Sequence, residues 1–338
     1  MTGLLRVKGT IDLIQFWPIN SSDADTTKIK VTVDANSFQF APDRIHFKTT
    51  HAFDEAYVKG TSARKLIDAQ NRITVRLQGI DAPELHYRAG ALRTGNPAIT
   101  PAKREAYNKA NREERRQYLA ETATVALAGK LKGFGNGTVE CHVLSIVDHP
   151  FEVVDTYGRF VGNIRVGSGF DTDINICLAE QGWCYPTFYS SMENEEIETL
   201  LAAMKKAGKK NVWKHYSKNL SVFDSKLQYR EPSDLPQPDP AKDKGPVLMP
   251  KLFRRQVAYR MERKAKIFSG TIKKYLESKP DSCFELQDFL VAGPHSAVPC
   301  VLHQFIVGSS SKLKPHEIVF REKFSTVVDK NGKIIEDF

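Results

Sequence analysis

Hydrophobic and polar residues alternate along several short segments of the first half of the chain. This two-residue period is typical of a strand that buries one face. The segments cover residues 4–18, 28–33, 75–80, 137–147 and 160–166. In the first of them the expected core residues are Leu5, Val7, Ile11, Leu13 and Ile14. Residues 34–71 are less regular, with aromatic residues among polar ones, and predict extra strands or a long excursion.

Three other segments have the composition and spacing of helices. Residues 101–131 are rich in Ala, Leu, Glu, Arg and Lys, with Pro101 suited to a first helical turn. Residues 173–182 predict a short helix closed by Gly182, and residues 195–210 predict a helix with one apolar face. Strands and helices in this order favour the α+β class.

The chain changes character after about residue 224. Residues 225–250 predict an extended linker, because six prolines fall among polar residues there. They are Pro232, Pro236, Pro238, Pro240, Pro246 and Pro250. We therefore expect a first domain over residues 1–224 and a small α+β domain over residues 251–338. The latter contains a basic helical run at 252–276, a strand at 298–307 and a hairpin turn at Asn331–Gly332.

Length and charge restrict the kind of protein. A chain of 338 residues favours two domains. Its net charge of +9 and pI of about 9.1 favour a polyanionic partner such as nucleic acid. No apolar run is long enough to span a membrane, and the first ten residues lack a signal-peptide pattern, so we expect a cytoplasmic protein. Five cysteines without a C-x-x-C motif predict reduced thiols, not a zinc site.

The segment from Val75 to Glu84 carries the most specific chemistry: Val-Arg-Leu-Gln-Gly-Ile-Asp-Ala-Pro-Glu. Its alternation places Arg76 on a strand, and Pro83 ends that strand because it has no N–H. Asp81 and Glu84 then lie on either side of the turn. A guanidinium group, a hard-metal ligand and a carboxylate base are what phosphodiester hydrolysis requires. An isolated Asp-x-x-Glu is more often a turn and a helix cap, so further matches are needed.

Those matches lie elsewhere in the first part of the chain. The region from about Leu5 to Trp213 resembles the thermonuclease family, whose members are staphylococcal-nuclease-like. The resemblance is carried, in the family's order, by residues 23–29, 75–84, 155–159, 174–183, 205–206 and 211–213. The Arg-Leu-x-x-Ile-Asp-Ala-Pro-Glu segment joined to a downstream Tyr-Gly-Arg is specific. The resemblance implies a five-stranded barrel of the OB type with three helices; residues 251–338 resemble no family known to us.

The resemblance also implies an activity, the Ca²⁺-dependent hydrolysis of DNA and RNA at the bond to the 5′ oxygen. Transferred by position, Asp25 and Asp81 correspond to carboxylate metal ligands and the Ala82 carbonyl to a further ligand, where the family often has Thr. Glu84 corresponds to the general base, and Arg76 and Arg159 to the phosphate clamps. Asp12 and Asp23 are neighbouring alternatives to Asp25.

We therefore expect a nuclease that acts on single-stranded DNA or RNA. The alternative is a non-catalytic nucleic-acid-binding or scaffold protein built on the same barrel. Residues 34–71 and 85–116 are longer than a minimal family member needs, and Tyr185, Phe188 and Tyr189 lack the family's tyrosine spacing. The C-terminal domain is assigned to binding a protein partner or to autoregulation.

Overall fold

The structure is a computed structural model that describes residues 2–16, 22–32, 34, 36–59, 64–92, 97, 99–229 and 243–338. Its contacts divide the chain into two compact units. The barrel unit comprises Met1–Ile80, Thr124–Glu180 and Glu322–Phe338, and the second unit comprises Asp81–Ala123 and Gln181–Arg321. Four prolines of the predicted linker, at positions 232, 236, 238 and 240, lie outside the described residues. The predicted domain boundaries stay a prediction.

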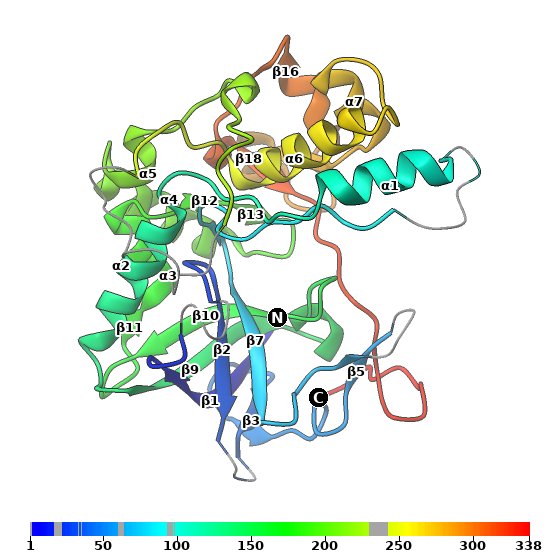
Figure 1. Cartoon of the computed structure of the whole chain (residues 1–338). Coiled ribbons are helices and arrows are strands. Elements are labelled where there is room, and N and C mark those ends of the chain that lie inside the picture. The colour runs from blue at the N-terminus through cyan, green and yellow to red at the C-terminus, as the bar shows by residue number, and fades with distance from the viewer. Residues whose placement is uncertain are drawn as a thin grey trace. The chain divides into compact units, whose positions relative to one another are not determined.

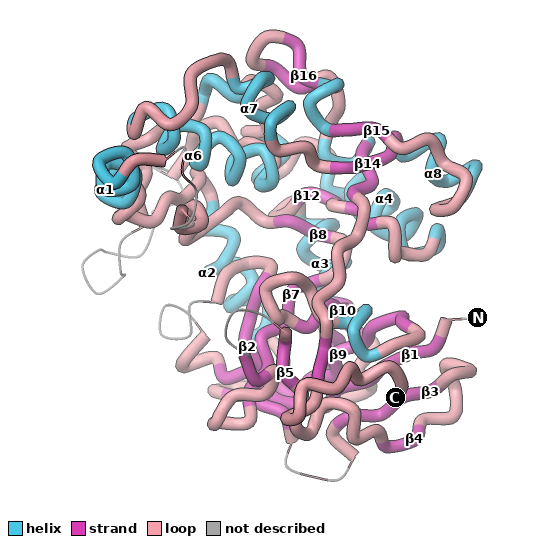
Figure 2. The backbone as a smooth tube through the Cα atoms, turned by 90° about the vertical axis from the view of Figure 1, so that its right-hand side faces the viewer, coloured by secondary structure: helices cyan, strands magenta, loops and turns pink. Residues whose placement is uncertain are grey.

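Five strands of the barrel unit form a closed barrel (Figures 1 and 2). They are β1 (Gly3–Asp12), β2 (Thr26–Val31), β7 (Arg72–Leu77), β9 (Thr138–Val147) and β10 (Phe160–Val166). The ring closes because β1 pairs with both β2 and β9, β2 with β7, β7 with β10 and β10 with β9. The β7–β10 pair is parallel and the other four are antiparallel. The predicted α+β fold with an OB-type barrel is confirmed.

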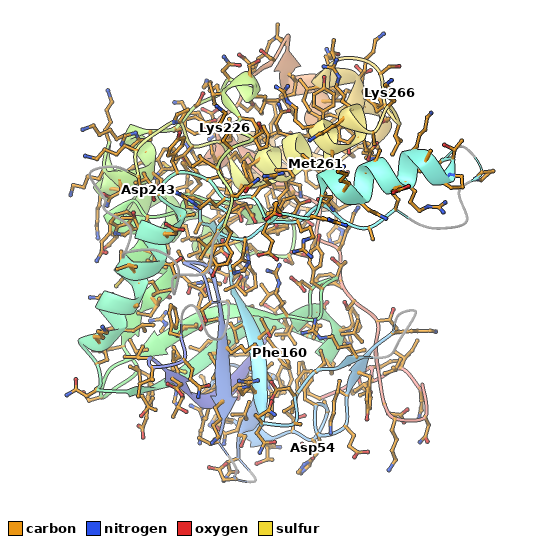
Figure 3. All side chains as sticks on the ribbon, viewed as in Figure 1. Asp54, Phe160, Lys226, Asp243, Met261 and Lys266 are labelled. Carbon is orange, nitrogen blue, oxygen red and sulfur yellow. The ribbon has the colours of Figure 1, made fainter. Side chains whose placement is uncertain are left out.

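The barrel interior follows the predicted alternation. Buried and partly exposed residues alternate along β1, β7 and β10, and Leu5, Val75 and Phe160 are fully buried. Phe160 is labelled in Figure 3. The prediction was wrong for Ile14, whose side chain is 76% exposed. The first strand ends at Asp12, because its carboxylate accepts hydrogen bonds from the backbone of the next turn instead of continuing the strand.

Two glycines and a buried amide shape the end of β7. A side chain at Gly162 on β10 would lie 2.5 Å from Ser145 Oγ, so only glycine allows β9 and β10 to approach this closely. Gly79 has a φ of 73°, which lets the chain turn directly after β7. Asn175 Nδ2 donates to the carbonyl of Gln78 at 2.9 Å and fixes the same turn.

The barrel unit carries further short elements. They are β3 (Phe38–Ala41), β4 (Lys48–Thr49), β5 (Tyr57–Val58), β6 (Arg64–Lys65), η1 (Pro150–Val153), β11 (Thr172–Asp173) and β19 (Val327–Val328). β19 pairs with β5, so the last residues of the chain join this unit. The predicted hairpin is confirmed, since Val328 pairs with Ile334 across the turn that contains Asn331–Gly332. The chain passes from one unit to the other within three elements, which are β8 (Ile80–Asp81), α2 (Ala120–Lys132) and α3 (Ile174–Gln181).

The second unit is built from helices and a small sheet. The helices are α1 (Pro101–Ala110), α4 (Asn194–Ala207), α5 (Asn211–Lys214), α6 (Pro250–Lys264), α7 (Ile272–Ser278) and α8 (Leu286–Ala292). The sheet has the order β13 (Phe188–Tyr189), β18 (Ile318–Phe320), β14 (Ser282–Glu285), β15 (Cys300–Val301). The remaining elements are β12 (Tyr185–Pro186), η2 (Leu220–Val222), η4 (Leu302–Phe305), β16 (Ile306–Val307), β17 (Ser310–Ser311) and η5 (Pro315–Glu317). Side chains of α1, α6 and α7 share one hydrophobic core.

Several predicted helices and strands are interrupted. The predicted helix over residues 101–131 is α1 and α2, because residues between them pair with another segment: Arg115 exchanges two backbone hydrogen bonds with Tyr87. The basic run over 252–276 is likewise α6 and α7. The predicted strand over 298–307 is divided into β15 and β16, which the 3₁₀ helix η4 separates. Within the described part of the chain, no helix combines the length and apolar character needed to cross a bilayer.

Candidate functional site

In the barrel unit, Arg76 pairs with Asp25. Arg76 Nη1 donates to Asp25 Oδ1 at 2.7 Å, and the two side chains are only 11% and 5% exposed. The pair forms because β2 and β7 are antiparallel neighbours, which places Thr26 opposite Arg76. Arg76 Nη2 also donates to the carbonyl of Ile80 at 3.1 Å. The strand end therefore holds this guanidinium group in a fixed orientation.

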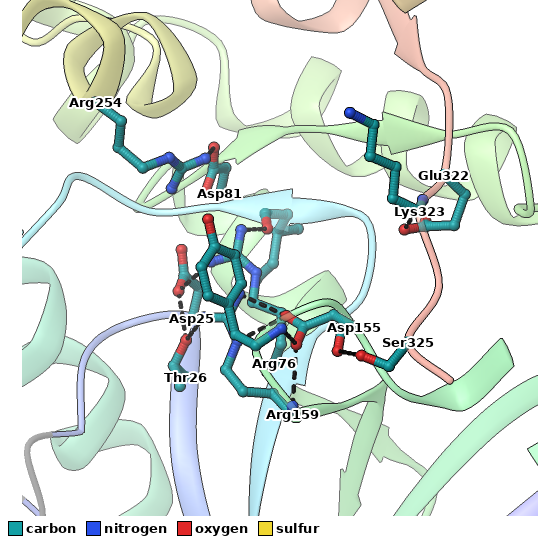
Figure 4. A network of polar contacts seen from close by, with 12 residues as sticks. Asp25, Thr26, Arg76, Asp81, Asp155, Arg159, Arg254, Glu322, Lys323 and Ser325 are labelled. Atoms are coloured by element: carbon teal, nitrogen blue, oxygen red, sulfur yellow. Dashed lines mark hydrogen bonds and ion pairs between the residues drawn. The ribbon is translucent and has the colours of Figure 1, made fainter. Parts of the chain in front are cut away.

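Arg159 joins the same network from the start of β10 (Figure 4). Its Nη1 donates to Thr26 Oγ1 at 3.3 Å, and the Thr26 hydroxyl donates to Asp25 Oδ1 at 3.0 Å. A continuous set of polar contacts thus links Arg159, through Thr26 and Asp25, to Arg76. The structure brings together three predicted site residues that are far apart in the sequence.

The two acidic alternatives to Asp25 have different surroundings. The Asp12 carboxylate accepts from the backbone N–H groups of Ile14 and Gln15 at 2.9 and 3.1 Å, in an exposed turn. The Asp23 carboxylate accepts from the backbone N–H of Asp25 at 3.1 Å. Asp25 is the acidic residue of this loop for which a contact with Arg76 is observed.

Asp155 is a residue that the sequence reasoning missed. Its Oδ2 accepts from Arg159 Nε at 2.8 Å and from Arg159 Nη2 at 2.7 Å, while its Oδ1 accepts from the backbone of Tyr157 and of Arg159. Gly158 has a φ of 75°, which allows the tight turn between the two partners. The signal was present in Asp-Thr-Tyr-Gly-Arg, since an Asp four residues before an Arg across a turn glycine can reach it.

Asp81, Ala82 and Glu84 belong to the second unit. Asp81 and Ala82 are buried, and the Glu84 side chain is 15% exposed. The Glu84 backbone is held on both sides by Gln117: its N–H donates to Gln117 Oε1 at 3.0 Å, and its carbonyl accepts from the Gln117 N–H at 2.8 Å. Gln117 is 33 residues away in the sequence, and nothing in its local pattern indicated this role.

A second residue that sequence reasoning did not assign is Arg254 of α6. Its Nη1 donates to Glu84 Oε1. Its Nη2 donates to Asp81 Oδ2 at 3.4 Å, a contact that Figure 4 shows. The sequence placed Arg254 only within a basic helical run. No local pattern could show that this guanidinium group contacts two carboxylates of a segment 170 residues earlier.

The start of α6 carries two other cationic residues, Lys251 and Arg255, whose side chains are partly buried. Burial lowers the pKa of Lys251 to about 8, and the neighbouring Asp281 carboxylate opposes that shift. Asp281 also accepts two hydrogen bonds from Arg255, at 2.8 and 2.7 Å. Asp281 thus holds Lys251 and Arg255, which flank Arg254 on the helix.

Each unit offers oxygen atoms of the kind that hard cations prefer. They belong to Asp25 in the barrel unit, and to Asp81 and the carbonyl of Ala82 in the second unit; Ca²⁺ favours such donors and tolerates irregular geometry and water ligands. Within the described residues, no group of three or more His, Cys, Asp or Glu side chains could hold a metal ion by itself. Both carboxylates form ion pairs with arginines. Their oxygen chemistry is compatible with Ca²⁺ that keeps several water ligands.

The closed barrel, with two arginines linked through a buried carboxylate and an Asp-Ala-Pro-Glu turn after β7, defines a staphylococcal-nuclease-like domain. Residues 74–215 match the family model described as staphylococcal nuclease homologue. The resemblance is thereby confirmed, and the C-terminal region has no match to a family. No curated protein matches the chain. A domain of this family indicates a nuclease or a nucleic-acid-binding protein.

Proposed function

We propose that the protein is a Ca²⁺-dependent nuclease that hydrolyses phosphodiester bonds of single-stranded DNA or RNA. The observation that carries the proposal is the network of Arg76, Asp25, Thr26 and Arg159 in the barrel unit. It orients two guanidinium groups, and the planar fork of N–H donors on a guanidinium group matches the geometry of phosphate oxygens. A cytoplasmic location stays a prediction.

Each residue has a stated role in the proposal. In the second unit, Asp81 and the Ala82 carbonyl would hold Ca²⁺, which when bound offsets the negative charge that develops on the phosphate. Asp25 of the barrel unit stays a predicted ligand. Arg76 and Arg159 donate to the non-bridging phosphate oxygens, and Asp155 keeps Arg159 aimed at them. Such preorganised donors stabilise the transition state because they need no reorganisation as charge develops.

Glu84 is the proposed general base. It accepts a proton from the water whose oxygen attacks phosphorus, while the bond from phosphorus to the 5′ oxygen breaks and that oxygen takes a proton from solvent. Gln117 supports this role because it holds the Glu84 backbone by two hydrogen bonds. A base must lie within hydrogen-bond reach of the proton that it removes, so a fixed backbone favours catalysis.

The test is cleavage of end-labelled single-stranded DNA and RNA by the full chain, with Ca²⁺ or with a chelator. Glu84→Gln should lower turnover about a hundredfold or more and leave substrate binding intact, because it removes the base but little volume. Glu105→Gln is the matched control, an exposed glutamate on α1 of the same unit. Cleavage that persists in the chelator contradicts the Ca²⁺ chemistry. Salt-sensitive binding without cleavage by the unaltered chain favours the non-catalytic alternative.

A further inference from the structure

Arg254 contacts two carboxylates that have roles in the proposed function: Asp81 as a metal ligand and Glu84 as the general base. Asp81 is completely buried, and the side chains of Glu84 and Arg254 are 15% and 25% exposed. All three lie in the second unit. A buried carboxylate is costly unless a cation or hydrogen-bond donors compensate its charge. The guanidinium group of Arg254 supplies part of that compensation to both acids at once.

The position of Arg254 is set by the helix that carries it. Leu252 and Phe253 are buried in the core of the second unit. Arg255, the next residue, forms a two-point ion pair with Asp281. The backbone of α6 is therefore anchored on both sides of Arg254, and the guanidinium group reaches the acids without a large rearrangement of the helix.

We propose that Arg254 is an internal counter-cation that offsets the negative charge of Asp81 and Glu84 and so competes with Ca²⁺ at Asp81. The inference rests on the proposed function, because that function makes Asp81 a metal ligand. A guanidinium group and a dication close to the same two carboxylates repel each other, and each offsets the same negative charge. Binding of Ca²⁺ at Asp81 then requires the Arg254 contacts to weaken or break, which reduces the apparent affinity of the site for the cation.

The experiment is a calorimetric titration of Ca²⁺ into the full chain and into Arg254→Gln. Removal of the competing charge should tighten Ca²⁺ binding about tenfold, a conservative figure for one charge a few ångströms away in a partly exposed site. Arg254→Lys keeps the charge but cannot bridge both carboxylates, so its affinity should lie between the other two. Arg260→Gln, which alters an exposed arginine of the same helix, should bind Ca²⁺ as the unaltered chain does.

Thermal unfolding provides a second readout. Without Ca²⁺, Arg254→Gln should unfold at a lower temperature than the unaltered chain, because two carboxylates lose a partner. Saturating Ca²⁺ should raise its unfolding temperature by more than it raises that of the unaltered chain.

The outcomes separate the inference from the function on which it rests. Equal Ca²⁺ affinity in the unaltered chain and Arg254→Gln, or weaker binding in the variant, overturns the competition and leaves the proposed metal site standing. Absence of Ca²⁺ binding from all four proteins overturns both. If Arg254→Gln does not fold, unchanged affinity in Arg254→Lys overturns the inference.

Discussion

Breaking the ion pair between Arg76 and Asp25 should strongly destabilise the barrel unit, and Arg76→Met tests this directly. The substitution keeps a long apolar side chain but leaves the Asp25 carboxylate, which is 5% exposed, without its guanidinium partner. Removing one member of a buried ion pair typically costs about 3–5 kcal/mol, mostly because the other charge stays buried and uncompensated. The Thr26 hydroxyl still donates to Asp25 at 3.0 Å, which favours the lower part of that range.

The same strand provides a matched control. Arg72 lies four residues earlier on β7 and pairs with Asp68 at 2.9 Å, but these side chains are 23% and 35% exposed. Partly exposed pairs of this kind contribute about 0–1 kcal/mol. Arg72→Met should therefore cost far less than Arg76→Met, although both replace an arginine by methionine on one strand.

The assay is urea unfolding of the full chain followed by far-ultraviolet circular dichroism, with the slopes of the transitions compared among variants. A double variant, Asp25→Leu with Arg76→Met, should be more stable than Arg76→Met alone, because no charge is then left buried. If Arg76→Met costs no more than Arg72→Met, burial does not make this pair important. If the double variant loses the sum of the single losses, the two side chains are not coupled.

Two other predictions concern the barrel unit. Asp155→Asn should lower cleavage efficiency about tenfold in the labelled-substrate assay, because Arg159 loses a charged partner that accepts two of its hydrogen bonds. Asp54→Asn, which alters an exposed aspartate, should leave the cleavage efficiency unchanged. Equal rates in the two variants would contradict the positioning role of Asp155. Burial, with nearby basic side chains, lowers the pKa of His142, which stacks on Phe170, from 6.5 to about 4. The unfolded chain therefore binds this proton more readily, so stability should fall as pH drops from about 6.5 to 4. The full shift corresponds to about 3 kcal/mol, and solvent screening of this partly exposed ring reduces the expected loss to about 2 kcal/mol. His142→Gln should avoid that loss when urea unfolding at pH 7 is compared with pH 4, and parallel losses in both proteins would contradict the assignment.

The sequence was most informative where a local pattern decides the structure. Alternation along β7 and β10 predicted strands with buried positions such as Val75 and Phe160, because one face of each strand must leave water. The end of this strand was predicted less well. The alternation kept Gly79 in a strand that Pro83 ends, whereas β7 ends at Leu77 and Gly79, with a φ of 73°, lies in the turn that follows. The same local reasoning failed at residues 111–119, where the composition favours a helix but contacts with Tyr87 and Glu84 separate α1 from α2.

The strand-forming pattern and the order of the candidate site motifs could thus be read from the sequence alone, because each depends on neighbours a few positions away. The contacts of the candidate site depended on tertiary structure. Arg76 meets Asp25 across 51 residues because the barrel closes around β2 and β7, and Arg254 reaches Glu84 across 170 residues because the second unit packs α6 there. Such contacts follow from how whole elements bury their apolar faces against each other, which no short stretch of sequence encodes.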